Sequence, residues 1–297
     1  MSQSSPPLSQ SAVLERTRAA GQGHLLSTWD TLSPADQRHL AAELAAVDFA
    51  LVQELAALLS RPSGGGSLPA LEPPELFPLE RSAQQRQRAA EAIEIGRRRL
   101  SEGRIGFLLV AGGQASRLGY EGPKGAFPIG PVSGRLLFDF FARRLLAAQA
   151  RHGFRASWYV MTSPGNHAET QACFERNAWF GLAKDQVFFF SQAMLPALDL
   201  QGRILLSAPG RLFLAPNGHG GVLDGLRRSG ALAHLRERGI ETLSYFQVDN
   251  PLAPPADPLF LGLHHAERSE MSTKVVSKRD AGEKVGVIGR IDGQVGC

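Results

Sequence analysis

Leu109-Val-Ala-Gly-Gly-Gln-Ala-Ser-Arg-Leu-Gly119 is followed closely by Gly122-Pro-Lys-Gly125. An apolar run that starts at Ile105 leads into this segment and ends in two adjacent glycines, Gly112 and Gly113. Glycine lets the backbone turn sharply and approach a ligand closely. We therefore predict a buried strand that ends in a bend, whose main-chain N–H groups can bind phosphate oxygens.

Two cations follow the glycines. Arg117 can donate two hydrogen bonds to one phosphate group, and Lys124 adds a positive charge at a fixed distance. We predict that both side chains neutralise the phosphates of a nucleotide. A turn with solvated charges would explain a lone Gly-Gly pair, but it explains the combination with Arg117 and Pro123-Lys124 poorly.

Two common phosphate-binding motifs do not fit this segment. The glycines are adjacent, so there is no G-x-G-x-x-G, and Lys124 is followed by Gly125, so there is no G-x-x-x-x-G-K-[ST]. The sequence therefore does not favour two classes of protein, the dinucleotide-dependent dehydrogenases and the P-loop ATPases.

From residue 104 onward, short apolar runs alternate with helical segments, which predicts a parallel α/β sheet. The expected strands are Ile105–Ala111, Ser157–Thr162, Val187–Ser191 and Leu243–Val248, with later ones at Lys274–Val276 and Val285–Ile291. The expected helices between them are Leu136–Gly153 and Gly221–Gly239.

The first hundred residues have a different character. We expect a disordered tail at 1–10, an N-terminal helical region at 11–103 with a linker near 61–74, and an α/β domain at 104–297. Ser33 is expected to cap a helix that starts at Pro34, and a later helix is expected from Arg81 to about Glu102. Because the last residues resemble neither a helix nor a tail, we expect the α/β domain to be incomplete at its C-terminus.

The composition of the 297 residues narrows the class of protein. With 43% hydrophobic and 20% charged residues, the chain is an ordinary globular one, and its net charge of +4 mildly favours phosphorylated partners. It has no Lys/Arg-rich run of the nucleic-acid type, so we expect no nucleic-acid partner, and its apolar runs are too short to suggest a membrane partner. Cys173 and Cys297 suggest neither a disulfide framework nor a zinc site, which favours a cytoplasmic location.

The glycine-rich segment resembles the nucleotidyltransferase signature L-x-G-G-x-G-T-R-L-G…P-K of the UDP-sugar pyrophosphorylases, in particular the UDP-N-acetylglucosamine pyrophosphorylase branch. Ala115 stands where that family has Gly, and Ser116 where it has Thr. The Cβ of Ala115 is expected to restrict the loop. The resemblance implies an α/β fold with a Rossmann-like mixed sheet, a GT-A-like nucleotidyltransferase core, and an N-terminal helical extension.

Later segments resemble the same family in the same order. Phe190-Ser-Gln-Ala-Met-Leu-Pro196 is similar to F-x-Q-G-x-x-P, which implies that Gln192 reads the uracil; a carboxamide can donate and accept against a pyrimidine edge. Ala215-Pro-Asn-Gly-His-Gly-Gly221 resembles A-P-[DN]-G-N-G-G, which implies that Gly218 lies against the base. His219 takes the place of the family's sugar-contacting Asn, and an ordinary loop histidine is an equal alternative.

Tyr245-Phe-Gln-Val-Asp-Asn-Pro251 resembles the family's strand ending in V-D-N, which implies that Asp249 holds Mg²⁺ (or Mn²⁺). For Asp257, which precedes Pro258, we prefer a helix cap or turn former.

The resemblance implies a uridylyltransferase that forms a UDP-sugar, in particular a UDP-N-acetylhexosamine, and pyrophosphate from UTP and a sugar 1-phosphate. One alternative is a truncated, catalytically inactive protein that binds a uridine nucleotide, and another is an unrelated Rossmann-type binding module. The predicted site residues are Arg117 and Lys124 for catalysis; Val110, Ala111, Gly112, Gly113, Gln192 and Gly218 for the nucleotide; His219 for the sugar; and Asp249 for the metal.

Overall fold

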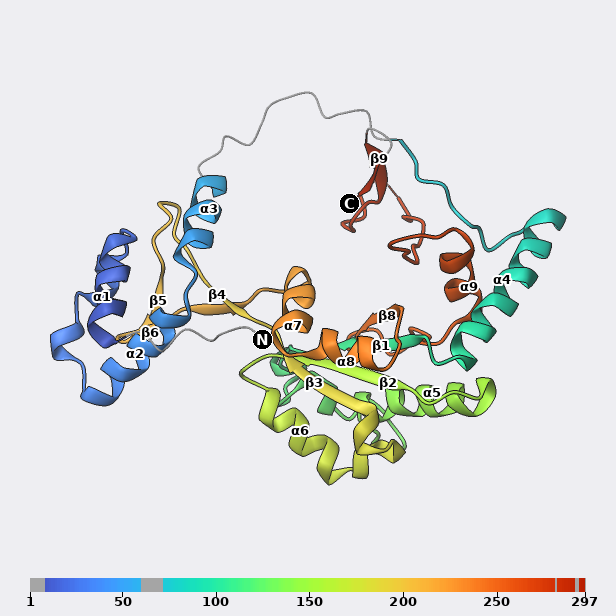
Figure 1. Cartoon of the computed structure of the whole chain (residues 1–297), viewed down its shortest axis with the longest axis horizontal. Helices are drawn as coiled ribbons and strands as arrows, with labels where there is room; N and C mark the ends of the chain where they lie inside the picture. Colours follow the sequence, from blue (N-terminus) through green and yellow to red (C-terminus); the bar gives the residue numbers. More distant parts are fainter. Residues whose placement is uncertain (1–8, 60–71, 281, 292–293, 297) are drawn as a thin grey trace. The chain divides into compact units, whose positions relative to one another are not determined.

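The computed structural model describes residues 9–59, 72–280, 282–291 and 294–296 (Figure 1). Contacts divide the chain into two compact units. We call residues 1–65 and 192–222 the helical unit, and residues 66–191 and 223–297 the sheet unit.

The sheet unit is built on four parallel strands in the order β3-β2-β1-β8. The chain moves outward from β1 to β2 and β3, and then returns to the other side of β1 for β8. Parallel sheets open a crevice at the carboxyl ends of two strands where the strand order reverses in this way. The strands are β1 (Ile105–Val110), β2 (Ser157–Thr162), β3 (Val187–Ser191) and β8 (Thr242–Gln247), each within one residue of its expected bounds.

Helices cover both faces of this sheet (Figure 1). On one face, Phe107 and Trp158 pack with Phe138 and Phe174 in a buried core. Phe138 belongs to α5 (Leu137–His152) and Phe174 to α6 (His167–Arg176). Helices α7 (Val222–Arg228) and α8 (Ala231–Glu237) lie over the other face. The α/β architecture expected from the sequence is therefore confirmed. In the described chain, antiparallel pairing occurs in two-stranded sheets and isolated bridges, outside the four-stranded parallel sheet.

Two expectations about regular elements were wrong. The helix expected at Gly221–Gly239 is split into α7 and α8, because Gly230 adopts a left-handed conformation with φ of +79°. No strand forms at Lys274–Val276, and of Val285–Ile291 only β9 (Gly289–Ile291) does, paired with β10 (Gln294–Gly296). Val276 is 89% exposed, and β-branched residues form a strand only where a neighbouring strand satisfies their backbone groups.

Helix α4 (Ala83–Ser101) packs closely against α9 (Pro258–Ala266). A Cβ on Gly262 would lie 1.6 Å from the carbonyl oxygen of Ala92, so glycine is what allows the two backbones to touch. Ser82 and Gln85 form a capping box at the start of α4. Asp257 caps α9 by accepting hydrogen bonds from the next helical amides, as expected.

The helical unit joins α1 (Gln10–Ala19), α2 (Pro34–Ala46) and α3 (Phe49–Leu59) to a segment that follows β3. Ser33 caps α2, as expected. The side chain of Gln22 accepts from Ile204 N and donates to Gly202 O, which ties the N-terminal helices to that segment. The strands of this unit are β4 (Met194–Pro196), β5 (Leu206–Ala208), β6 (Arg211–Leu212) and β7 (Leu214–Pro216), paired β4–β7 and β5–β6.

Short 3₁₀ turns occur in both units: η1 (Gly23–Leu26), η2 (Trp29–Thr31), η3 (Ser116–Leu118), η4 (Lys124–Ala126), η5 (Ala178–Gly181), η6 (Lys184–Gln186) and η7 (His219–Gly221).

The expected regions and the two units are not the same division of the chain. The expected helical region 11–103 contributes α1 to α3 to the helical unit and α4 to the sheet unit. The expected tail 1–10 and linker 61–74 lie mostly outside the described residues, although α1 already begins at Gln10 and Glu72 pairs with Arg290. The domain boundaries stay a prediction.

Within the described ranges, no helix combines the length and the apolar character that crossing a bilayer requires.

Helix α8 is held to the sheet by a buried polar contact. Tyr159 on β2 is fully buried, and its Oη lies 2.9 Å from Nδ1 of His234. Arg238 Nε donates to Nε2 of the same ring, so the neutral ring carries its proton on Nδ1 and donates it to Tyr159. Burial and the charge of Arg238 lower the pKa of His234, and burial raises the pKa of Tyr159 to about 12.

We predict that acid weakens this contact. A histidine whose pKa is lower in the folded than in the unfolded chain stabilises the fold fully above its ordinary pKa of about 6.5, and this contribution is lost as the pH falls. In urea titrations between about pH 8 and 5, the free energy of unfolding should therefore fall more steeply in the wild type than in His234→Gln. Burial also lowers the pKa values of His152, His264 and His265, and the comparison with His234→Gln separates their effect. Parallel pH profiles would contradict the prediction.

Candidate functional site

The candidate site lies in the sheet unit, where β1 and β8 end beside each other. Val248 N donates to the carbonyl of Val110, the last residue of β1, and Ala111 N donates to Met161 O on the other side. The segment after β1 is therefore hydrogen-bonded to both neighbouring strands as it leaves the sheet. It leaves at the point where the strand order reverses.

The residues after β1 form a bend that we call the glycine loop (residues 111–115). The amides of its first and last residues are occupied, because Ala115 N donates to Gly122 O at 3.0 Å. The three amides between them, on Gly112, Gly113 and Gln114, donate to no group within the described ranges. Three consecutive N–H groups are thus free to meet an acceptor, as a phosphate-binding bend requires.

The glycines around this loop are there for different reasons. A Cβ on Gly125 would lie 2.1 Å from Cζ of the buried Phe138 ring, so packing requires glycine there. A Cβ on Gly113 would come no closer than 3.8 Å to the Lys124 side chain, and its φ is not positive, so the chain itself does not require glycine there. Ala115 has a φ of −91° and is fully buried. Its negative φ is compatible with a side chain, and the restriction expected from its Cβ stays a prediction.

Lys124 and Asp249 meet beside the glycine loop. Lys124 Nζ lies 2.9 Å from Oδ1 and 3.1 Å from Oδ2 of Asp249, and Lys124 N donates to Gly113 O. The two side chains are 25% and 55% exposed, and an exposed ion pair contributes only about 0–1 kcal/mol. An incoming anion can therefore draw Lys124 away from Asp249 at little cost.

Arg117 lies in η3, close in sequence to the loop. Its side chain is exposed, and the described part of the chain gives its guanidinium no hydrogen-bond or ion-pair partner. It is thus accessible to an anion.

The other predicted residues lie in the helical unit. Gln192 directly follows β3 and is 6% exposed, and Gly218 has φ of +65° and ψ of −153°, a combination that is nearly restricted to glycine. Asn217 N donates to Ala193 O, which continues the β4–β7 pairing and places the two segments that hold Gln192 and Gly218 side by side. His219 begins η7. The predicted residues therefore form two groups, one in each unit.

The sequence interpretation missed Asn166. This side chain is 1% exposed and donates to the carbonyls of Ala111 and Gly113, at 3.1 and 3.2 Å. The available signal was a polar residue in a Pro-Gly turn directly after β2, at the same edge of the sheet as the glycine loop. Among the described residues, no three His, Cys, Asp or Glu side chains gather into a metal-binding cluster, so Asp249 offers a single carboxylate.

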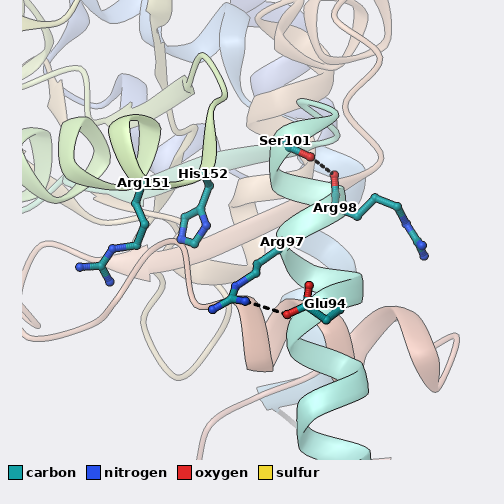
Figure 2. A pocket seen from close by; sticks show the side chains of 6 residues that line it. All are labelled: Glu94, Arg97, Arg98, Ser101, Arg151 and His152. Atoms are coloured by element: carbon teal, nitrogen blue, oxygen red, sulfur yellow. Dashed lines mark hydrogen bonds and ion pairs between the residues drawn. The ribbon is translucent and has the colours of Figure 1, made fainter.

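A separate depression lies at the C-terminal ends of α4 and α5, which lead into the amino ends of β1 and β2 (Figure 2). Arg97 pairs with Glu94 there. Burial lowers the pKa of His152, and the positive charges of Arg151 and Arg97 lower it further. Arg98, Arg151 and His152 lie in the last turns of α4 and α5, where cations complement the helix dipole. It lies at the edge of the sheet opposite the glycine loop.

Comparisons with known proteins identify the family. A family model described as UTP–glucose-1-phosphate uridylyltransferase matches residues 75–297. The chain belongs to this uridylyltransferase family. The match confirms the resemblance seen in the sequence, and it excludes an unrelated Rossmann-type module.

Individual members of the uridylyltransferase family agree with this. The chain is 35% identical over 291 residues to UDP-N-acetylglucosamine diphosphorylase 2 of Arabidopsis thaliana, covering 94% of this chain and 58% of that protein. It is 33% identical over 290 residues to UDP-N-acetylglucosamine pyrophosphorylase of Saccharomyces cerevisiae, covering 91% and 59%. The crystal structure of the uridine diphosphate N-acetylglucosamine pyrophosphorylase of Trypanosoma brucei, in complex with an inhibitor, matches with a TM-score of 0.77 and 31% identity, covering 100% of this chain and 61% of that one. The chain thus spans about three fifths of the length of these relatives.

The different roles of Gly113 and Gly125 can be tested by stability. Gly125→Ala should lower the free energy of unfolding by about 1–3 kcal/mol, because the added methyl group overpacks against Phe138. Gly113→Ala should leave it unchanged or raise it by about 0.4–1 kcal/mol, since alanine restricts the unfolded chain. Urea unfolding of both variants measures the difference. Equal destabilisation by the two substitutions would contradict this account of the loop.

Proposed function

We propose that this chain carries the nucleotide-binding part of a uridylyltransferase that joins UTP to an N-acetylhexosamine 1-phosphate, releasing pyrophosphate. The observation that carries the proposal is the row of three amides beside Lys124 that donate to no group of the described residues, at the point where the strand order reverses. The relatives' names, which specify UDP-N-acetylglucosamine, support the choice of sugar. We also propose that the protein is located in the cytoplasm.

In the proposed reaction, a phosphate oxygen of the sugar 1-phosphate attacks the α-phosphorus of UTP. The new P–O bond forms in line with the bond to the β-phosphate, which breaks, and its electron pair leaves with pyrophosphate. No covalent enzyme intermediate is needed. The protein's contribution is to hold the two substrates in line and to stabilise the charge on the phosphate oxygens.

Each predicted residue has a role in this scheme. The glycine-loop amides and Arg117 bind the phosphates, and Lys124 moves from Asp249 to a phosphate oxygen. Val110 to Gly113 hold the uridine. Gln192 and Gly218 recognise the uracil, and His219 contacts the sugar.

A divalent cation, Mg²⁺ or Mn²⁺, is part of the proposal. Magnesium is commonly held by one or two carboxylates together with substrate phosphates, and Asp249 fits such a role because its carboxylate already faces a cation, the Lys124 ammonium. The metal would neutralise part of the phosphate charge. Asp249 would hold it, which frees Lys124 for the nucleotide.

Removal of Arg117 tests the phosphate contacts. A hydrogen bond to a charged group contributes about 1.5–3 kcal/mol, so Arg117→Ala should weaken UTP binding by about tenfold or more in calorimetry. Arg151→Ala is the matched control, since it removes an arginine at the opposite edge of the sheet, and its affinity should match the wild type. A wild-type chain that does not bind UTP would refute the proposed function. Pyrophosphate release with UTP, Mg²⁺ and sugar 1-phosphates then separates the enzyme from the inactive nucleotide-binding alternative.

Neutralising Asp249 tests the metal. Without Mg²⁺, Asp249→Asn should bind UTP at least as tightly as the wild type, because a negative charge beside the triphosphate is gone. Added Mg²⁺ should tighten UTP binding by on the order of tenfold in the wild type, and much less in the variant. Asp185→Asn is the matched control, because Asp185 is another carboxylate of the sheet unit that pairs with a basic side chain. This variant should keep the full response to Mg²⁺. Retention of that response in Asp249→Asn would rule out the proposed metal role.

A further inference from the structure

Asn166 has an unusual place at the start of α6. It is the residue before the helix, where an Asn side chain ordinarily accepts a hydrogen bond from one of the first helical amides. Ser33, Ser82 and Asp257 do this for their helices, but Asn166 does not. Its side chain faces the glycine loop instead.

The hydrogen-bonding groups of this side chain are used as follows. Nδ2 donates to Ala111 O at 3.1 Å and to Gly113 O at 3.2 Å, and Oδ1 accepts from Ser163 N at 2.9 Å. The carboxamide is thus held by the turn after β2 and in turn holds two carbonyls of the loop after β1. A second, weaker tie runs from Gln114 Nε2 to Gly165 O at 3.3 Å.

These two carbonyl bonds determine the direction of two amides. In a planar trans peptide, the C=O of one residue and the N–H of the next point in opposite directions. Because Ala111 O points toward Asn166, the N–H of Gly112 points away from it. Gly113 O, which accepts from Lys124 N as well as from Asn166, fixes the N–H of Gln114 in the same way. Both amides are among the three that donate to no group of the described chain.

We propose that Asn166 is a positioning residue that holds the Gly112 and Gln114 amides outward, ready for the phosphates of the nucleotide. The inference rests on the proposed function, because it takes the glycine loop as the phosphate-binding element. Asn166 touches no substrate in this arrangement. Its contribution is that the loop does not have to be ordered when the nucleotide arrives, which favours tight binding.

Two substitutions separate this role from helix capping. Asn166→Asp has the same shape but cannot donate, and it sets a carboxylate against two carbonyl oxygens. Asn166→Ser is an equally good residue before a helix, but its side chain is too short to reach both carbonyls. Asn177→Ser is the matched control, since Asn177 lies at the other end of α6 and donates to Cys173 O at 2.8 Å, away from the loop.

The readout is calorimetric affinity for UTP and for uridine, which carries the base and ribose but no phosphate. We expect both Asn166 variants to bind UTP about tenfold or more weakly, with a clearly smaller loss of affinity for uridine, and Asn177→Ser to match the wild type for both ligands. Thermal unfolding confirms that the variants are folded.

Three results would overturn the inference. Equal losses of UTP and uridine affinity would indicate a general structural role for Asn166. Unchanged UTP affinity in a folded Asn166→Asp chain would show that its donors do not matter. A wild-type chain that binds uridine but gains nothing from the triphosphate would refute the phosphate-binding loop itself, and with it the proposed function.

Discussion

The site depends on one constraint, which is that β1 is hydrogen-bonded on both sides up to its last residue. Met161 O accepts from the amide of Ala111, and Val110 O accepts from the amide of Val248. The chain therefore leaves the sheet at a fixed point, between the ends of β2 and β8. The turn after β2 then supplies Asn166 to the glycine loop, and the segment after β8 supplies Asp249 to Lys124. Two loops on either side of β1 thus shape the segment between them.

Local patterns were sufficient to predict much of this. Apolar runs bounded by glycine gave β1, β2, β3 and β8 to within one residue, and Ser33 and Asp257 were recognised as caps because capping depends on a few neighbouring residues. The bend after β1 was predicted from the two adjacent glycines, and three of its amides donate to no group of the described chain.

Long-range contacts explain what the sequence did not reveal. The hydrogen bonds of Asn166 reach back to Ala111 and Gly113, and no local pattern marks such a partner. In the same way, Gln22 joins the N-terminal helices to Gly202 and Ile204, so residues 192–222 belong to the helical unit although they follow a strand of the sheet. The split of the expected helix at Gly221–Gly239 depended on a single glycine, Gly230, whose left-handed conformation is one of several that glycine adopts. The roles of the predicted site residues stay predictions.

The contact between α4 and α9 has a consequence for how the sheet unit forms. More than half of the chain lies between Gly96 and Pro258, whose backbones touch in the finished structure. Contacts between residues so distant in sequence carry a high entropic cost of loop closure and slow the folding rate. During synthesis, α4 emerges from the ribosome long before its partner helix exists. One side of α4 therefore stays unprotected until the final third of this sequence has been translated.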